Sequence, residues 1–227
     1  MLKKIFLPVF LLILLIDLFA IYTGNITVQF IVKPMILGSL IFFFLVRSYG
    51  KDKMIRSYLL AGLFFSLTGD ILLMFDSDPR FFLFGLSAFL IAHICYIILF
   101  SSLRNKERLG INAWNFIPVA IYYAALAFTL YPFLGEMRLP VLVYGSVISI
   151  MFVLALHMTS MVYREAGKWM AIGAAFFVLS DSLLAFNKFY QSFPFAGILI
   201  MLTYAAAQYG IVKGVLSYLA EKENDRI

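Results

Sequence analysis

Two aspartates in otherwise apolar stretches are the residues of this 227-residue chain best suited to catalysis. They stand in the segments Thr68-Gly69-Asp70 and Ser180-Asp181-Ser182, so small residues and hydroxyl groups adjoin both carboxyl groups. An ionisable side chain in the hydrocarbon layer of a membrane costs at least about 2.5–3.5 kcal/mol, and it is therefore a functional candidate by default. The structural alternative is a buried polar pair that ties two helices together.

The chemistry that two such carboxyl groups allow is acid catalysis. In a shared pocket of low dielectric constant they should not both be ionised, because desolvation and mutual repulsion disfavour two charges. One group then remains a proton donor and the other is an anion. This pairing is typical of reactions in which an acid protonates the substrate while a carboxylate stabilises an oxocarbenium-like state or activates water. We therefore predict that Asp70 and Asp181 are catalytic.

Few other polar residues interrupt the apolar stretches, namely Asp17, Lys33, His93, His157, Gln208 and Lys213. We expect Asp17, Lys33 and His93 to join the two aspartates in a polar pocket that opens to the outer side. Asp17 could instead be a solvated helix end, and Lys33 could extend to the outer headgroups. His157 and Lys213 fall near the cytoplasmic face, where packing and interfacial roles are the simpler interpretations.

Other reaction classes fit the sequence less well. The single cysteine, Cys95, allows no thiolate metal cage, and the two histidines lie at different depths, whereas a zinc hydrolase needs three protein ligands. We therefore predict no metal and no cofactor. The sequence has no G-x-S-x-G elbow of a serine hydrolase. Intramembrane aspartyl proteases also use two aspartates, but Thr68-Gly69-Asp70 and Ser180-Asp181 match their Gly-x-Gly-Asp and Tyr-Asp motifs poorly.

Eight apolar stretches, each close to the length that crosses the roughly 30 Å hydrocarbon layer, must position these residues. The composition agrees, since 63% of the residues are hydrophobic and 13% are charged, against roughly 45–50% and 25% in soluble domains. We predict an all-α fold, a bundle of eight transmembrane helices in one domain over residues 1–227. The first stretch is expected to be a retained helix, because no small-x-small cleavage site follows it. The predicted spans are 5–22, 30–46, 57–75, 81–103, 114–134, 139–163, 169–186 and 195–219.

The distribution of Lys and Arg orients the bundle, because cytoplasmic loops of membrane proteins are enriched in them. With the amino terminus inside, the cytoplasmic side receives thirteen: Lys3, Lys4, Arg47, Lys51, Lys53, Arg56, Arg104, Lys106, Arg108, Arg164, Lys168, Lys222 and Arg226. The outer side receives only Arg80, Arg138 and Lys188. Both termini are therefore predicted to be cytoplasmic, in the inner (plasma) membrane if the protein is bacterial. The net charge of +6 then needs no nucleic-acid partner.

The third and seventh stretches resemble each other. Aligning Asp70 with Asp181 also aligns Gly62 with Gly173 and four further pairs of Phe or Leu. This predicts two four-helix halves in parallel orientation, an arrangement known among membrane proteins. Leu and Phe matches also arise by chance in membrane helices, so both interpretations stay open. Both aspartates lie about 18–20 Å along their helices at 1.5 Å per residue, and hence at one depth.

Several short motifs follow one another along the chain in a characteristic order. They are Lys33-Pro34, Gly69-Asp70-Ile71-Leu72-Leu73, Phe84-Gly85, Phe89, Ala92-His93 through Tyr96, Gly173 to Phe177, Ser180-Asp181-Ser182-Leu183-Leu184-Ala185, and Tyr204 through Ala207-Gln208. Their order and spacing resemble the YhhN family of eight-helix membrane proteins, whose characterised animal members are lysoplasmalogenases. The likeness covers nearly the whole chain, with the first, fifth and sixth helices matched by pattern.

The resemblance implies that a lysophospholipid vinyl ether is hydrolysed to a fatty aldehyde and glycerophosphoethanolamine or glycerophosphocholine. Asp70 and Asp181 would be the general acid and the carboxylate that stabilises the cation or activates water, in an order that the sequence leaves open. Lys33 would hold the phosphate or tune this pair. The further substrate-binding candidates are His93, Gln208, Tyr204 and Ser180. The alternatives are a small transporter or lipid-binding protein that couples protons through the same Asp/Lys site, and a structural scaffold.

Overall fold

The computed structural model describes residues 2–75 and 78–225, and within these ranges it contains helices and no strand. Eight long helices are described: α1 (Leu2–Thr23), α2 (Ile26–Arg47), α3 (Lys53–Leu72), α4 (Pro79–Lys106), α5 (Phe116–Leu130), α6 (Arg138–His157), α7 (Arg164–Ala185) and α8 (Ala196–Asn224). Each of them, in some cases with a short adjoining helical turn, is long and apolar enough to cross a membrane. The predicted all-α, multi-pass membrane bundle is confirmed.

The helix ends differ most from the predicted boundaries at the sixth and seventh spans. α6 ends at His157 and a short 3-10 turn follows over Met158–Ser160, whereas the predicted span continued to Tyr163. α7 begins at Arg164, before its predicted start at Trp169. The turn packs directly on α7, because a Cβ atom at Gly167 would lie 1.9 Å from the carbonyl oxygen of Met158. The glycine therefore lets two backbone segments touch, which a hydrophobicity pattern does not reveal.

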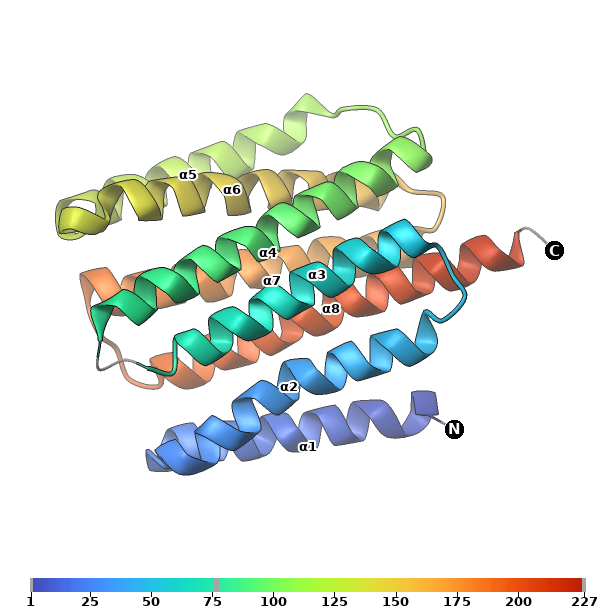
Figure 1. The fold of residues 1–227 in the computed structure, drawn as a ribbon. Helices are drawn as coiled ribbons and strands as arrows, with labels where there is room; N and C mark the ends of the chain where they lie inside the picture. Colours follow the sequence, from blue (N-terminus) through green and yellow to red (C-terminus); the bar gives the residue numbers. More distant parts are fainter. Residues whose placement is uncertain (1, 76–77, 226–227) are drawn as a thin grey trace.

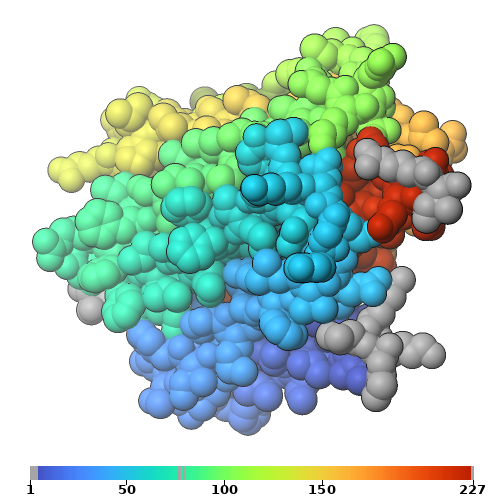
Figure 2. Space-filling model, turned by 45° about the vertical axis from the view of Figure 1, so that its right-hand side comes forward, coloured from blue at the N-terminus to red at the C-terminus, as the bar shows by residue number. Residues whose placement is uncertain are grey.

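The helices alternate in direction, and both chain ends lie at the same end of the bundle (Figure 1). α7 and α8 make the most extensive contact, followed by α3 and α4, and these four helices form the centre. α1 and α2 flank the centre on one side, with α5 and α6 on the opposite side. The space-filling view agrees, since it places the amino-terminal helices and the α5 region at opposite edges (Figure 2).

The charge asymmetry predicted from the sequence separates the two ends of the bundle. The basic residues assigned to the cytoplasm lie at the end that holds the termini, except Arg226, which is outside the described residues. Arg80, Arg138 and Lys188 lie near the opposite end of the bundle. Which of these ends faces the cytoplasm stays a prediction.

Helix neighbours repeat between the two halves of the chain. α3 packs on α4 as α7 packs on α8, and α2 contacts α3 as α6 contacts α7. Between the halves, α2 touches α8 while α6 touches α4. Two equivalent halves, α1–α4 and α5–α8, would produce this pattern, which agrees with the predicted duplication.

Glycines let α7 and α8 approach closely. A Cβ atom at Gly173 would lie 2.6 Å from the backbone nitrogen of Ile211 and 2.7 Å from the carbonyl oxygen of Ala207. Small residues at helix interfaces are a common means of close packing in lipid, where the hydrophobic effect does not drive helices together. The α7–α8 pair carries Asp181, Tyr204 and Gln208, so the spacing of these side chains depends on this contact.

We expect Gly173→Ala to destabilise the protein, because the added methyl group forces two backbones apart. Overpacking of this kind typically lowers the free energy of unfolding by about 1–3 kcal/mol. The measurement is the thermal unfolding midpoint in detergent micelles. Gly38→Ala is the matched control, since no described atom lies within 4 Å of a Cβ at Gly38 and alanine favours a helix by up to ~1 kcal/mol. Equal midpoints for the two variants would contradict the close contact.

Ion pairs join helix ends on the side of the bundle that holds both termini. Glu107, directly after α4, accepts hydrogen bonds of 2.6 Å from Lys222 Nζ and from Tyr218 Oη of α8. Partial burial acts to raise the pKa of Glu107, but these two hydrogen bonds outweigh it and hold that pKa below its ordinary value of 4.5. Two further ion pairs at this end are Lys106–Asp52 and Lys51–Glu223.

The lowered pKa of Glu107 predicts a loss of stability in acid. Its ionised form stabilises the fold fully above the ordinary value of 4.5, and this contribution disappears as the pH falls through the lower folded value. At pH 7, Glu107→Gln should lower the free energy of unfolding by about 1–3 kcal/mol. The difference in the free energy of unfolding between this variant and the unchanged protein should become smaller in acid. Thermal unfolding at pH 7 and at a pH below 4.5 measures this difference. Glu136→Gln, on an exposed residue, is the control. A difference that does not change with pH would contradict the prediction.

Candidate active site

Asp70 lies near the end of α3 and is almost fully buried. Its Oδ2 atom accepts a 2.6 Å hydrogen bond from the hydroxyl of Tyr204 on α8. One turn further along α8, Gln208 Oε1 accepts a 2.7 Å hydrogen bond from the hydroxyl of Tyr96 on α4. Polar groups buried in apolar surroundings need such partners. These two pairs form a polar cluster that joins α3, α4 and α8.

Asp181 on α7 has a different set of neighbours. Its Oδ2 atom accepts a 2.5 Å hydrogen bond from the hydroxyl of Tyr144 on α6, and His93 Nε2 of α4 lies 3.8 Å from the same oxygen. His93 Nδ1 is 2.7 Å from the carbonyl oxygen of Phe89, which can only accept, so Nδ1 carries a hydrogen. In the neutral ring Nε2 is then an acceptor, and it has no hydrogen-bond partner among the described residues. A shift of roughly 1 Å would let a protonated Asp181 donate to it.

Asp17 and Lys33 lie beside Asp70. Asp17 is fully buried in α1, and within the described residues neither of its carboxyl oxygens has a hydrogen-bond partner. Lys33 of α2 is half-buried and close enough to both Asp17 and Asp70 for electrostatic attraction. Of the interpretations that the sequence left open, the solvated helix end is therefore wrong for Asp17. The Lys33 ammonium group is placed to balance buried carboxylates.

The single polar pocket expected from the sequence is divided in two by aromatic rings. The ring centroid of Phe177 lies 4.6 Å from that of His93 and 5.6 Å from that of Tyr204. His93 therefore belongs with Asp181, whereas Lys33, Tyr204 and Gln208 surround Asp70. Ser180 donates a 3.0 Å hydrogen bond to the carbonyl oxygen of Ile200 on α8, so its hydroxyl is turned toward that backbone.

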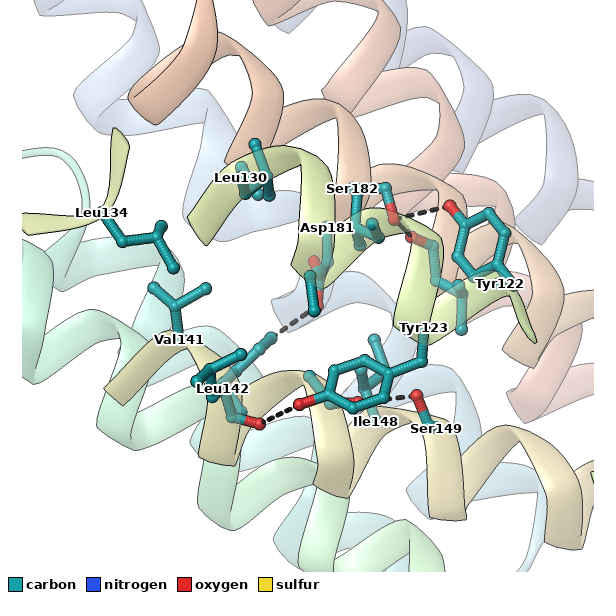
Figure 3. Close-up of a pocket in the computed structure, with 16 residues that line it drawn as sticks. Tyr122, Tyr123, Leu130, Leu134, Val141, Leu142, Ile148, Ser149, Asp181 and Ser182 are labelled. Carbon is teal, nitrogen blue, oxygen red and sulfur yellow. Dashed lines mark hydrogen bonds between the residues drawn. The ribbon is translucent and has the colours of Figure 1, made fainter. Parts of the chain in front are cut away.

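A cavity between α5, α6 and α7, here named the α5 cavity, is bordered by Asp181 and not by Asp70 (Figure 3). Its volume is about 60 Å³, measured for the centre of a water-sized sphere. The polar lining residues are Tyr122, Tyr123, Tyr144, Ser149, Asp181 and Ser182, and the others are mostly aliphatic. A smaller cavity of about 40 Å³ adjoins Asp181 and Tyr144 from the side of α4. Of the two aspartates, Asp181 is therefore the one placed to meet a ligand in these cavities.

Tyr144, which the sequence reasoning missed, has a counterpart in the first half of the chain. It follows Lys33 by 111 residues, and the same separation relates Asp181 to Asp70 and Tyr204 to His93. Each aspartate is thus neighboured by one residue from the second helix of its own half and one from the fourth helix of the other half. The alignment of the third and seventh helices, if extended to their neighbours, would have indicated Tyr144.

The remaining polar candidates have structural contacts. His157 Nε2 accepts a 2.9 Å hydrogen bond from the backbone nitrogen of Asn112, and Lys213 Nζ lies 3.5 Å from the ring centroid of Trp169. Both arrangements agree with packing and interfacial roles. Within the described part of the chain, no group of three or more His, Cys, Asp and Glu side chains could hold a metal ion.

Comparison with known proteins places the chain among multi-pass membrane proteins. The model of the YhhN family matches residues 28–215. The chain is 32% identical over 162 residues to a lysoplasmalogenase of Mycobacterium bovis, an alignment that covers 70% of this chain and 60% of that protein. It is 33% identical over 143 residues to the lysoplasmalogenase TMEM86B of Rattus norvegicus, covering 63% of this chain and 54% of that protein. The matches thus span about 54–60% of the length of these relatives. No solved structure matches the chain.

The two tyrosine-to-aspartate hydrogen bonds should contribute measurably to stability. We expect Tyr144→Phe and Tyr204→Phe each to lower the free energy of unfolding by about 1–3 kcal/mol, because each leaves a buried carboxyl group without its donor. Thermal unfolding in detergent micelles measures the change. The control is Tyr209→Phe on α8, since the Tyr209 hydroxyl makes no hydrogen bond with the described residues. Wild-type midpoints for both site variants would show that the hydrogen bonds are not formed.

Proposed function

Because the chain belongs to the YhhN family, as its motifs predicted, we propose that it hydrolyses the vinyl ether of lysoplasmalogens, lysophospholipids with one alkenyl chain. The products would be a fatty aldehyde and a glycerophospho-headgroup. Relatives named lysoplasmalogenase support this reaction class. The observation that carries the proposal is the position of Asp181, which is bound by Tyr144, lies beside His93 and borders a cavity inside a membrane bundle.

The proposed reaction balances with water as the only co-reactant. An acid protonates the vinyl carbon remote from the ether oxygen, and the electron pair of the double bond forms the new C–H bond. The oxygen stabilises the resulting cation as an oxocarbenium ion. Water then adds to the carbon bonded to oxygen, which gives a hemiacetal and returns one proton to the protein. The hemiacetal collapses to the aldehyde and the glycerol hydroxyl.

Asp181 is assigned the role of general acid, because it is the aspartate that borders the cavities. Tyr144 bonds to Oδ2, which leaves Oδ1 free to carry the proton that is transferred. After the transfer, the Asp181 carboxylate and His93 Nε2 are the nearby acceptors for the proton of the attacking water. The carbonyl oxygen of Phe89 holds His93 in the tautomer that this step requires.

Asp70 is assigned the role of the stabilising carboxylate. It is buried away from the cavities, yet close enough to Asp181 for their charges to interact. A fixed negative charge in a site of low dielectric constant stabilises a developing cation more than it would in water. Lys33 would balance this charge rather than hold the phosphate, because it lies beside two carboxyl groups and borders neither of the described cavities.

Gln208, Tyr204 and Ser180 are assigned positioning roles. Tyr204 orients Asp70, and Gln208 orients Tyr96 next to it. Ser180 fixes α7 against the backbone of α8 one residue before Asp181. With both termini in the cytoplasm, as predicted, the two aspartates would lie toward the outer leaflet and draw the substrate from it.

A proton-coupled transporter is the second candidate function, because Asp17, Lys33 and Asp70 form a buried charged group. Asp17 in particular has no hydrogen-bond partner among the described residues, and intramembrane carboxyl groups are typical of proton pathways. Chemical turnover separates the two functions. Release of aldehyde by the purified, detergent-solubilised protein supports hydrolysis, whereas a protein that binds lysoplasmalogen and releases no aldehyde contradicts it.

We expect Asp181→Asn to reduce aldehyde release by about 10²–10⁴-fold, because an amide cannot supply the acid proton. Asp70→Asn should lower the rate at least about tenfold through loss of the stabilising charge. Aldehyde released from lysoplasmalogen is the measurement, and an unchanged thermal midpoint shows that each variant is folded. Asp225→Asn, at an exposed position after α8, is the control and should be fully active. Full activity in both site variants would overturn the mechanism.

A further inference from the structure

The α5 cavity is apolar along most of its length. Aliphatic side chains line the part near the connection from α5 to α6, and those labelled in Figure 3 are Leu130, Leu134, Val141 and Leu142. The hydroxyl groups of Tyr122 and Ser182 lie on the other side of Asp181 in that view. A ligand that fills this space would therefore be mainly hydrocarbon and would pass directly beside the carboxyl group.

The size of the cavity limits what it can hold. A volume of about 60 Å³ for the centre of a water-sized sphere is several times the roughly 10–15 Å³ that one water needs. This volume suits part of one aliphatic chain rather than two. A whole lipid molecule cannot enter unless one of the surrounding helices moves.

Of the three helices that line the cavity, α5 is the least buried. Val119 and Leu130 are its only buried residues, whereas Ile121 and Phe128 are largely exposed on the side that would face lipid. Near its middle, α5 is joined to α7 by a 2.8 Å hydrogen bond from Tyr122 to Ser182. Tyr123 donates a second hydrogen bond, of 2.9 Å, to the carbonyl oxygen of Leu142 on α6. Few contacts must therefore break for the middle of α5 to move outward.

Contacts also hold both ends of α5. Before the helix, the backbone nitrogen of Asn112 donates a hydrogen bond to His157. After it, the guanidinium group of Arg138 lies 4.6 Å from the ring centroid of Tyr131, and the rings of Phe133 and Tyr190 are 5.0 Å apart. Among the described residues, the Tyr122–Ser182 hydrogen bond is the one that joins α5 to α7, so opening it would expose the cavity and Asp181 on that side.

We propose that the α5 cavity binds the aliphatic chain of a single-chain lipid, which enters from the bilayer between α5 and α7 when the Tyr122–Ser182 hydrogen bond opens. The site deepens the proposed function and rests on it for the identity of the reactive bond. Entry from the bilayer follows from the apolar outer face of α5. Selection of one chain over two follows from the small volume of the cavity, and the first bonds of the chain would then meet Asp181.

The test uses a saturated 1-O-alkyl glycerophosphocholine with a photoreactive diazirine in its chain, added to the full-length protein in lipid nanodiscs. The saturated ether has no double bond to protonate, so labelling does not depend on hydrolysis. Ala127→Phe fills the cavity from α5 and should raise the half-saturating probe concentration at least tenfold. Ala124→Phe adds the same side chain at an exposed position of α5 that does not border the cavity, and it should change the concentration less than twofold.

A second variant and the map of labelled residues test the entry route. Tyr122→Phe removes the hydrogen bond to Ser182 and should make labelling approach saturation faster than in the unchanged protein. Labelled residues should fall within 122–134, 141–149 and 178–185, the α5, α6 and α7 walls of the cavity. The labelled residues are mapped on the unchanged protein, so this measurement tests the chain site even if the Ala127→Phe variant does not fold.

The outcomes separate this inference from the proposed hydrolysis. Labels confined to residues outside these three walls, or equal half-saturating concentrations for the unchanged protein and a folded Ala127→Phe variant, would overturn the chain site while leaving aldehyde release untouched. Labelling in the α5 cavity without aldehyde release from lysoplasmalogen would overturn the hydrolysis and support the chain site. A Tyr122→Phe variant that labels no faster than the unchanged protein would overturn the entry route.

Discussion

The need to pair buried polar groups inside a lipid-facing bundle is the constraint on which this structure depends. Lipid offers no hydrogen bonds, so the Asp70 and Asp181 carboxyl groups depend on partners within the protein. Tyr204 supplies the partner of Asp70 from α8, which is distant in sequence, and Tyr144 supplies the partner of Asp181 from α6, the preceding long helix. Their hydroxyls reach the carboxyl groups because α3 packs near α8 and α6 near α7. The glycine contacts between α7 and α8 thus bear on the candidate site, since they set the position of Asp181 relative to Tyr204, the hydrogen-bond donor to Asp70.

The sequence predicted the helices well because length and hydrophobicity alone decide whether a segment can cross a membrane. It singled out Asp70 and Asp181 because charges are rare in these spans. It could not indicate Tyr144, since tyrosine occurs 13 times and only tertiary packing shows which hydroxyl meets a carboxylate. The early end of α6 was missed for a similar reason, because it follows from the backbone contact at Gly167.

The count of residues along each helix predicted the depth of each polar residue but not the direction in which it points. Depth follows from the count of residues along a helix, whereas rotation about the helix axis is set by packing. One pocket was therefore predicted for Asp70 and Asp181. In the structure, Phe177 packs between His93, which neighbours Asp181, and Tyr204, which binds Asp70. The division matters for mechanism, because an acid and an anion must differ in environment to keep different protonation states.

The predicted repeat offers a physical reason for that difference. Positions 33 and 144 are equivalent under the 111-residue shift, as are positions 93 and 204, so one scaffold surrounds each aspartate. The first half places the cation of Lys33 beside Asp70, together with a second carboxyl group at Asp17. The second half places the neutral hydroxyl of Tyr144 and an imidazole acceptor beside Asp181. A cation favours an anion next to it, whereas a neutral donor and acceptor accommodate a carboxyl group that retains its proton. Under the proposed mechanism, these two positions would take the two different roles that acid-catalysed cleavage of a vinyl ether requires.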